Sequence, residues 1–137
     1  MKLKLSELTG RALNYAVAVC EYGEPKYAPA CGWHMFGGGY GKIVRDAVSA
    51  TPMGEEFNPS GNWSHGGPLI DKYATQLSAP SSFDNEGHIA ATYVKGKGRG
   101  LKSGETYLIA FCRSLVSAIH GDDEIEIPDD LMEGAKP

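Results

Sequence analysis

The feature that most constrains the fold is a stretch of apolar residues at helical spacing between Thr106 and His120. Residues three and four apart share one face of an α-helix, so this spacing predicts a helix with one buried side. Glu105 lies favourably near the N-terminal end, and Gly121 is a C-terminal stop signal. The apolar positions are Leu108, Phe111, Cys112, Leu115, Val116 and Ile119.

A second helix is predicted from about Thr9 to Tyr22, because Leu13, Ala16, Val17 and Cys20 also recur at helical spacing. Ser6, Glu7 and Thr9 offer capping oxygens before it, Gly23 ends it, and Pro25 prevents its continuation. A shorter helix of about two turns is expected to contain Leu69, Ile70 and Tyr73.

The other apolar segments are short, and several alternate as strands do. Strands are expected at Lys2–Leu5, His88–Val94 and Glu124–Ile127, with Trp33–Phe36 as a further candidate, and Pro128 stops ladder pairing. Ile43, Val44 and Val48 fit either a strand or a short helix. We therefore expect an α+β fold, with two principal helices packed on a small, mainly antiparallel sheet and joined by glycine-rich loops.

Length and charge limit the organisation and the partners. A chain of 137 residues is expected to be a single domain, 1–137, whose acidic C-terminal segment, 122–137, forms an edge strand and a tail. The net charge is −4, and the basic residues cluster only between Lys95 and Lys102. A nucleic-acid polymer is a disfavoured partner, because phosphate neutralisation needs a broad basic face.

The cysteines and the hydropathy pattern indicate a reducing compartment. Cys20, Cys31 and Cys112 are odd in number and widely spaced, and no signal peptide or membrane-length apolar run occurs. We expect a cytosolic protein with reduced thiols and no membrane association.

Residues Asn62 to Leu69 form the richest candidate binding motif. Glycines let backbone amides approach a partner closely, and Pro68 fits the first position of a helix. Amides placed before a helix N-terminus can hold a phosphate. The structural alternative is a tight turn anchored by Trp63, since Gly-Gly-Pro is common turn punctuation.

Three segments in order resemble the NinX-like family of small bacteriophage proteins: Glu7–Ala18, Asn58–Ile70 and Thr106–Val116, the last continued by Gly121–Pro128. Departures include His65, where an amide-bearing residue is expected, the stretch Gly37–Gly41, and the glycine-rich basic loop 95–100. The resemblance implies a phage protein made in the cytoplasm of an infected bacterial host. It implies no catalytic mechanism.

The sequence lacks the spacing of common catalytic motifs. The histidines form no H-E-x-x-H pair, no G-x-S-x-G elbow occurs, and Ile43 follows Lys42 where a phosphate loop needs Ser or Thr. A metal site would need distant ligands such as Cys31, His34 and His65, and is disfavoured. We expect a non-enzymatic protein without a metal or a cofactor.

The remaining chemistry suits a ligand with an aromatic base and phosphates. Trp63 is a candidate for stacking, the amides of Ser64 to Gly67 for holding a phosphate, and the basic residues for charge-assisted bonds. A core position is the alternative for Trp63, and a structural ion pair or helix-surface role is the alternative for Arg113. The predicted ligand-binding residues are Asn62, Trp63, Ser64, His65, Gly66, Gly67, Lys95, Lys97, Arg99 and Arg113.

We therefore expect a phage accessory protein that binds and sequesters a small nucleotide-derived ligand, such as a host antiviral immune signal. The alternative is a protein–protein interaction module that contacts a host or phage protein through the acidic C-terminal strand. A homo-oligomer is also expected, with the apolar segment Trp33–Phe36 as its interface.

Overall fold

Three α-helices and three small antiparallel sheets make up the part of the chain that the computed structural model describes, namely residues 2–28, 31–36, 42–45, 56–78, 87–121 and 123–131. The helices are α1 (Gly10–Tyr22), α2 (Trp63–Tyr73) and α3 (Tyr107–His120). The predicted α+β class is confirmed, but the strands form three separate sheets where one was expected.

Every strand pairing in the described residues is antiparallel. The first sheet pairs β1 (Lys2–Lys4) with β8 (Glu124–Glu126). The second has the order β2 (Lys26–Ala28), β3 (Trp33–Phe36), β4 (Lys42–Arg45). The third has the order β5 (Gln76–Ser78), β6 (His88–Val94), β7 (Gly98–Gly104).

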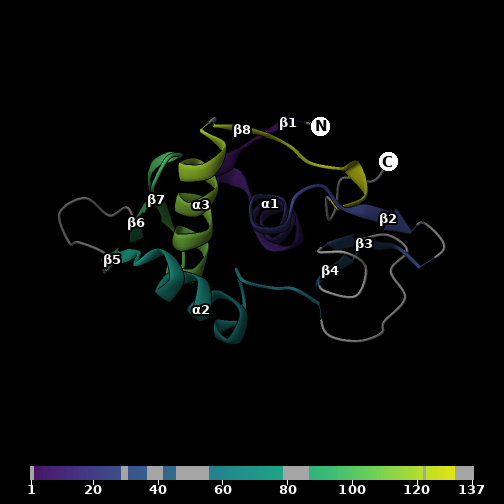
Figure 1. Cartoon of the computed structure of the whole chain (residues 1–137), viewed down its shortest axis with the longest axis horizontal. Coiled ribbons are helices and arrows are strands. Elements are labelled where there is room, and N and C mark those ends of the chain that lie inside the picture. Colours follow the sequence, from purple (N-terminus) through teal and green to yellow (C-terminus); the bar gives the residue numbers. More distant parts are fainter. Residues whose placement is uncertain are drawn as a thin grey trace.

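Helix α3 lies between the third sheet and α1, while the second sheet lies on the far side of α1 (Figure 1). The predicted limits of both long helices are confirmed. Thr9 and Thr106 are the N-cap residues, and the Thr106 side chain accepts a hydrogen bond from the Ile109 amide at 3.1 Å. Burial of both helices creates a continuous core, in which Leu13, Val17, Phe111 and Leu115 are fully enclosed.

Strand β7 packs directly on the backbone of α3, which the sequence did not predict. A Cβ at Gly100 would lie 2.0 Å from the Ser114 carbonyl oxygen, and one at Gly104 would lie 2.8 Å from the Ala110 amide nitrogen. Only glycine permits so close an approach at these positions. The prediction of a loop over residues 95–100 holds only for the tight turn at 95–97. It is wrong for residues 98–100, which belong to β7, because the alternate glycines form the face of this strand that meets the helix.

Helix α2 begins at Trp63, five residues before Pro68, the predicted first position. Asn62 is its N-cap, Trp63 is its first residue, and Pro68 lies inside it instead of at its first position. A proline there removes one helical hydrogen bond, and its exposed position lets water compensate the orphaned carbonyl. The motif is thus mostly a helix, not a turn before one.

Other predictions have mixed outcomes. Trp33–Phe36 and Ile43–Val44 lie on strands, whereas Leu5 begins a 3-10 helix, Leu5–Glu7, where the first strand was expected to continue. A second 3-10 helix, Asp129–Leu131, follows β8. The glycine stretch Gly37–Gly41 and the tail 132–137 lie outside the described residues. Within the described residues, no helix is both long and apolar enough to cross a membrane.

Candidate functional site

A buried polar cluster, which we call the polar junction, ties α1 to the start of α2. It consists of Asn14, Asn58, Ser60, Asn62, His65 and Gly66. Asn14, only 2% exposed, donates from Nδ2 to Asn58 Oδ1 at 2.9 Å and accepts from the Ser60 amide and hydroxyl at 3.0 and 2.7 Å. The backbone amide of Asn58 donates to His65 Nδ1 at 2.8 Å. The amide and imidazole side chains of this cluster are thus engaged within the fold.

The backbone amides proposed to hold a phosphate are also engaged. The Ser64 amide donates to Asn62 Oδ1 at 2.9 Å, and those of His65 and Gly66 donate to the Asn62 carbonyl at 3.0 and 2.9 Å. Gly66 is buried, and a Cβ there would lie 2.6 Å from the Pro59 carbonyl oxygen. These three amides already donate hydrogen bonds within the chain, so in this geometry they are not free to hold a phosphate.

Trp63 differs from its neighbours because its side chain is 55% exposed. The alternative of a core position for Trp63 is therefore wrong. Gly67 is near it but is not tightly packed, since a Cβ there would meet only the Trp63 ring, at 4.0 Å. The indole is accessible, whereas the backbone amides of Ser64, His65 and Gly66 in the same turn are engaged.

Lys95 and Lys97 lie far from Trp63. Gly66 packs beside Leu108 in the first turn of α3, whereas Gly98 packs beside Ala118 in the last. These positions on α3 are separated by roughly 15 Å of helix. Lys95 and Lys97, in the turn that leads to Gly98, are therefore remote from Trp63, and the predicted set does not converge on one site.

Arg113 holds elements of the fold together. Its Nε donates to the Leu8 carbonyl at 3.1 Å and its Nη1 donates to the Ser103 carbonyl at 2.8 Å. Burial lowers the pKa of this guanidinium, and the Glu105 carboxylate opposes that shift. The structural role was the predicted alternative for Arg113, although its partners are backbone carbonyls and not a carboxylate.

Arg99 instead belongs to an open cavity of about 470 Å³ at the third sheet, which we call the sheet-face pocket. Arg99 lies directly opposite Tyr93 in the β6–β7 register, on the face turned away from α3. Tyr93 is 62% exposed, and Arg99 is exposed beside it. The lining includes Tyr73, Gln76, Ala91, Thr92, Tyr93 and Arg99.

Hydrogen bonds within the fold hold two of the lining residues, Tyr73 and Thr92, in place. The Tyr73 hydroxyl donates to Glu21 Oε1 at 2.7 Å, and burial together with this bond raises the pKa of Tyr73. Thr92 is linked through its hydroxyl to Thr75 at 2.8 Å and to Ser114 at 2.7 Å. A cavity with fixed walls, aromatic rings and one arginine suits a flat ligand that carries negative charge.

Tyr73, Gln76 and Tyr93 are not among the residues that the sequence predicted for the site. The available signal was the strand prediction for His88–Val94 itself, because alternation places Tyr93 on the opposite face from Thr92 and Val94. The role of this exposed face depends on the pairing of β7 with β6, which places Arg99 beside Tyr93.

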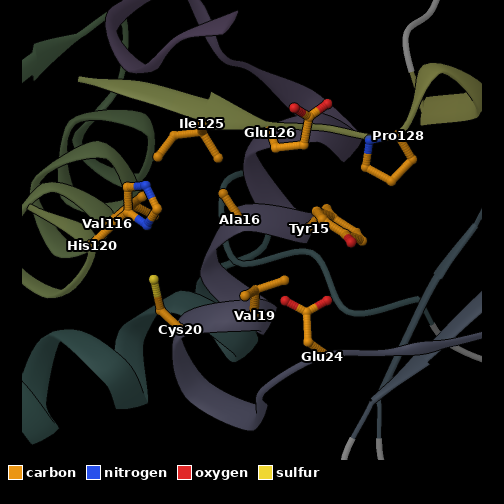
Figure 2. A pocket seen from close by; sticks show the side chains of 10 residues that line it. All are labelled: Tyr15, Ala16, Val19, Cys20, Glu24, Val116, His120, Ile125, Glu126 and Pro128. Carbon is orange, nitrogen blue, oxygen red and sulfur yellow. The ribbon is translucent and has the colours of Figure 1, made fainter. Parts of the chain in front are cut away.

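A second cavity, of about 270 Å³, lies between α1, the end of α3 and β8 (Figure 2); we call it the interhelical cavity. Its apolar walls are Ala16, Val19, Val116, Ile125 and Pro128. The other lining residues are Tyr15, Cys20, Glu24, His120 and Glu126. Burial raises the pKa of Cys20 to about 12, so its thiol is protonated at neutral pH and is a poor nucleophile.

No group of three or more His, Cys, Asp or Glu side chains within the described ranges is arranged to hold a metal ion. His34, one of the distant ligands weighed from the sequence, is buried and packs its ring on Tyr15 and Tyr27. Cys31 lies in the turn between β2 and β3, whereas His65 lies on α2 and is engaged in the polar junction.

Comparisons with known proteins identify the family. No curated protein matches the chain. A solved structure of similar fold is the 2.0 Å crystal structure of a phage protein from Bacillus cereus ATCC 14579, with a TM-score of 0.51, 15% identity, and coverage of 82% of this chain and 93% of the other. The family model described as bacteriophage P22 NinX matches residues 4–118. The chain therefore belongs to the NinX family of bacteriophage proteins.

Proposed function

We propose that this is a non-enzymatic phage accessory protein that binds and sequesters a small nucleotide-derived ligand in the sheet-face pocket. We expect this ligand to be a host antiviral immune signal in the cytoplasm of the infected bacterium. The observation that carries the proposal is the cross-strand pair of Tyr93 and Arg99 on an open, concave sheet face. Family membership supports a phage role and says nothing of the ligand.

Each part of such a ligand has a chemical counterpart in the pocket. The exposed ring of Tyr93 offers a stacking surface for a base, which is worth about 1–3 kcal/mol in nucleic-acid complexes. Arg99 offers a planar, bidentate donor for a phosphate, and Gln76 offers an amide for a base edge.

The local charge also favours an anion. Among the described residues, those that line the sheet-face pocket include Arg99 and no carboxylate. Exposed Lys95 and Lys97 lie in the turn that joins β6 to β7, within a few residues of the Tyr93–Arg99 pair. These cations would strengthen the attraction at low ionic strength and lose effect as salt screens them.

Calorimetry against cyclic oligonucleotides and ADP-ribose derivatives tests the proposal. The wild-type chain is expected to bind at least one member of the panel, and Arg99→Gln and Tyr93→Ala to weaken that binding. Lys26→Gln is the matched control, because it removes an exposed cation on another sheet. No binding across the panel, or equal loss in the control, would overturn the proposal.

Mass spectrometry of the recovered ligand tests the non-enzymatic part. Sequestration needs affinity without turnover, so prolonged incubation with a bound panel member is expected to return it unchanged. A product whose amount grows with protein concentration would show an enzyme instead.

A protein–protein interaction module is the second candidate. Within the described residues β8 pairs with β1 alone, which leaves one edge of β8 without a neighbouring strand. Deletion of this segment is unsuitable as a test, because Ile125, Ile127 and Leu131 are buried in the core. Pull-down from infected cells with a Glu124→Lys, Glu126→Lys double variant keeps the apolar residues. A partner lost in that variant would favour this candidate.

We also propose homo-oligomerisation, but only part of the segment predicted as its interface is accessible. His34 and Phe36 are buried, and Trp33 and Met35 are half-buried. Leu101 on the third sheet, which is 65% exposed, offers a further apolar surface for such an interface. Light scattering is expected to give a mass above that of one chain, and a monomer at micromolar concentration would contradict this.

A further inference from the structure

We infer that the interhelical cavity is a second binding site, which accepts a small molecule with an apolar body and a positively charged amine. This site is separate from the sheet-face pocket, and the ligand that it suits has the opposite charge. The inference rests on three features of the cavity: its size, its apolar walls and the sign of the charge around it.

The size and walls of the cavity fit a small apolar body. Its volume of about 270 Å³ corresponds to roughly nine water-sized volumes, and so to a ligand of about nine non-hydrogen atoms. Val19 from α1, Val116 from α3 and Ile125 from β8 face it from three directions (Figure 2). Burying an apolar body of this size removes water-exposed surface from both partners.

The charged groups select a cation. Glu24 and Glu126 line the cavity, and no lysine or arginine lines it among the described residues. In Figure 2 their carboxylates lie on two sides of Tyr15, with His120 across the cavity. Lys2 lies opposite Glu126 in the β1–β8 register but does not line the cavity. A carboxylate near an apolar cavity favours an ammonium group and repels a phosphate.

The Cys20 thiol supports this assignment. Cys20 lies on the α1 side of the cavity (Figure 2), and burial raises its pKa to about 12, so it adds no negative charge at neutral pH. It therefore behaves as part of the apolar wall. The ammonium group of the ligand would therefore interact with Glu24 and Glu126.

The test compares three probes of similar size: 2-phenylethylamine, its neutral isostere 2-phenylethanol, and phenylacetate. Amide chemical shifts of the full-length chain are followed during each titration. The amine is expected to shift residues that line the cavity and to bind at least tenfold more tightly than the alcohol, whereas phenylacetate is expected not to bind there. Equal affinity for amine and alcohol, or no binding of the amine, would overturn the inference.

Charge-neutralising variants locate the selectivity. Glu24→Gln and Glu126→Gln are each expected to weaken amine binding about three- to tenfold, and together to remove the preference over the alcohol. Glu124→Gln is the matched control, because it neutralises an exposed carboxylate on the same strand outside the cavity lining. Equal loss in that control would contradict the site.

The Arg99→Gln variant separates this inference from the proposed function. It is expected to weaken nucleotide binding and to leave amine binding unchanged, because Arg99 lines the sheet-face pocket and is not among the described residues that line the interhelical cavity. Loss of amine binding in Arg99→Gln would show that one site serves both ligands and would overturn the inference. Circular dichroism checks that each variant is folded.

Discussion

The polar junction and the sheet-face pocket use polar chemistry in opposite ways. In the junction, Asn14 makes three hydrogen bonds at 2% exposure, and the first amides of α2 are occupied by Asn62. In the pocket, Tyr93 and Arg99 lie side by side on an open sheet face. The first region holds the fold together, and the second presents groups to solvent.

The difference shows that a motif dense in glycine and amide residues can serve packing alone. The segment around Asn62 contains the groups that an anion site needs, but its neighbours within the chain already use most of them. The accessible groups lie in an ordinary-looking strand pair. The experiments below test whether stability depends on the junction and binding on the sheet face.

Asn14→Ala is expected to have the largest effect. It deprives the amide and hydroxyl of Ser60 and the side chain of Asn58 of a buried partner, and unsatisfied buried groups cost about 1–3 kcal/mol each. We expect a loss of about 3 kcal/mol in the free energy of unfolding, measured by urea denaturation. A loss below about 0.5 kcal/mol would mean that water replaces Asn14 at no cost.

Gly66→Ala and Gly67→Ala form a matched pair on α2. A Cβ at Gly66 would meet the Pro59 carbonyl oxygen at 2.6 Å, whereas one at Gly67 has its first contact at 4.0 Å. We expect Gly66→Ala to destabilise by about 2 kcal/mol through overpacking, and Gly67→Ala to stabilise by up to about 1 kcal/mol through helix propensity. Urea denaturation of both variants measures the contrast. Equal effects of the two would contradict the close packing of the junction.

Arg99→Gln tests whether the sheet-face pocket contributes to ligand binding and not to stability. The arginine is exposed, so its loss is expected to change the free energy of unfolding by less than about 0.5 kcal/mol. Affinity for an anionic panel ligand is expected to fall about tenfold, which corresponds to about 1.4 kcal/mol. Calorimetry and urea denaturation on the same preparation measure the two effects. A stability loss as large as that of Asn14→Ala would show that the pocket is structural.

Trp63→Ala is expected to have the smallest effect. The indole is 55% exposed and remote from Lys95 and Lys97, so its loss is expected to change stability by less than about 0.5 kcal/mol. Ligand affinity is expected to change less than threefold in calorimetry. A loss of binding greater than that in Arg99→Gln would indicate that the ligand binds at the Asn62–Leu69 motif instead of the sheet-face pocket.

Periodicity predicted the long elements well. Helix α3 and strand β6 have the predicted bounds within a residue. Helix α3 keeps one helical period over its full length and ends at Gly121, and β6 is a short run rich in apolar residues between Gly87 and Gly96. Helix α2 was predicted too short, because glycine and proline lower local helix propensity. The Asn62 cap and the packing of Gly66 against Leu108 outweigh that propensity.

Strand β7 and the sheet-face pocket could not be predicted locally. The alternate glycines of 96–100 are typical of a flexible loop, and only the approach of α3 explains why Gly100 needs no side chain. Apolar Ile89 and Ala91 also suggest that their face of β6 is buried, whereas Ala90 and Thr92 are the buried residues. Pairing across strands, which brings Arg99 beside Tyr93, is not encoded by the spacing of either segment.

The most direct test of the central claim is a map of backbone amide shifts during titration with the tightest-binding member of the nucleotide panel. The account predicts the largest shifts at Gln76, Ala91, Tyr93 and Arg99, with small shifts at Trp63 and Ser64. The opposite pattern, with the largest shifts at Trp63 and Ser64 and none on the third sheet, would contradict it.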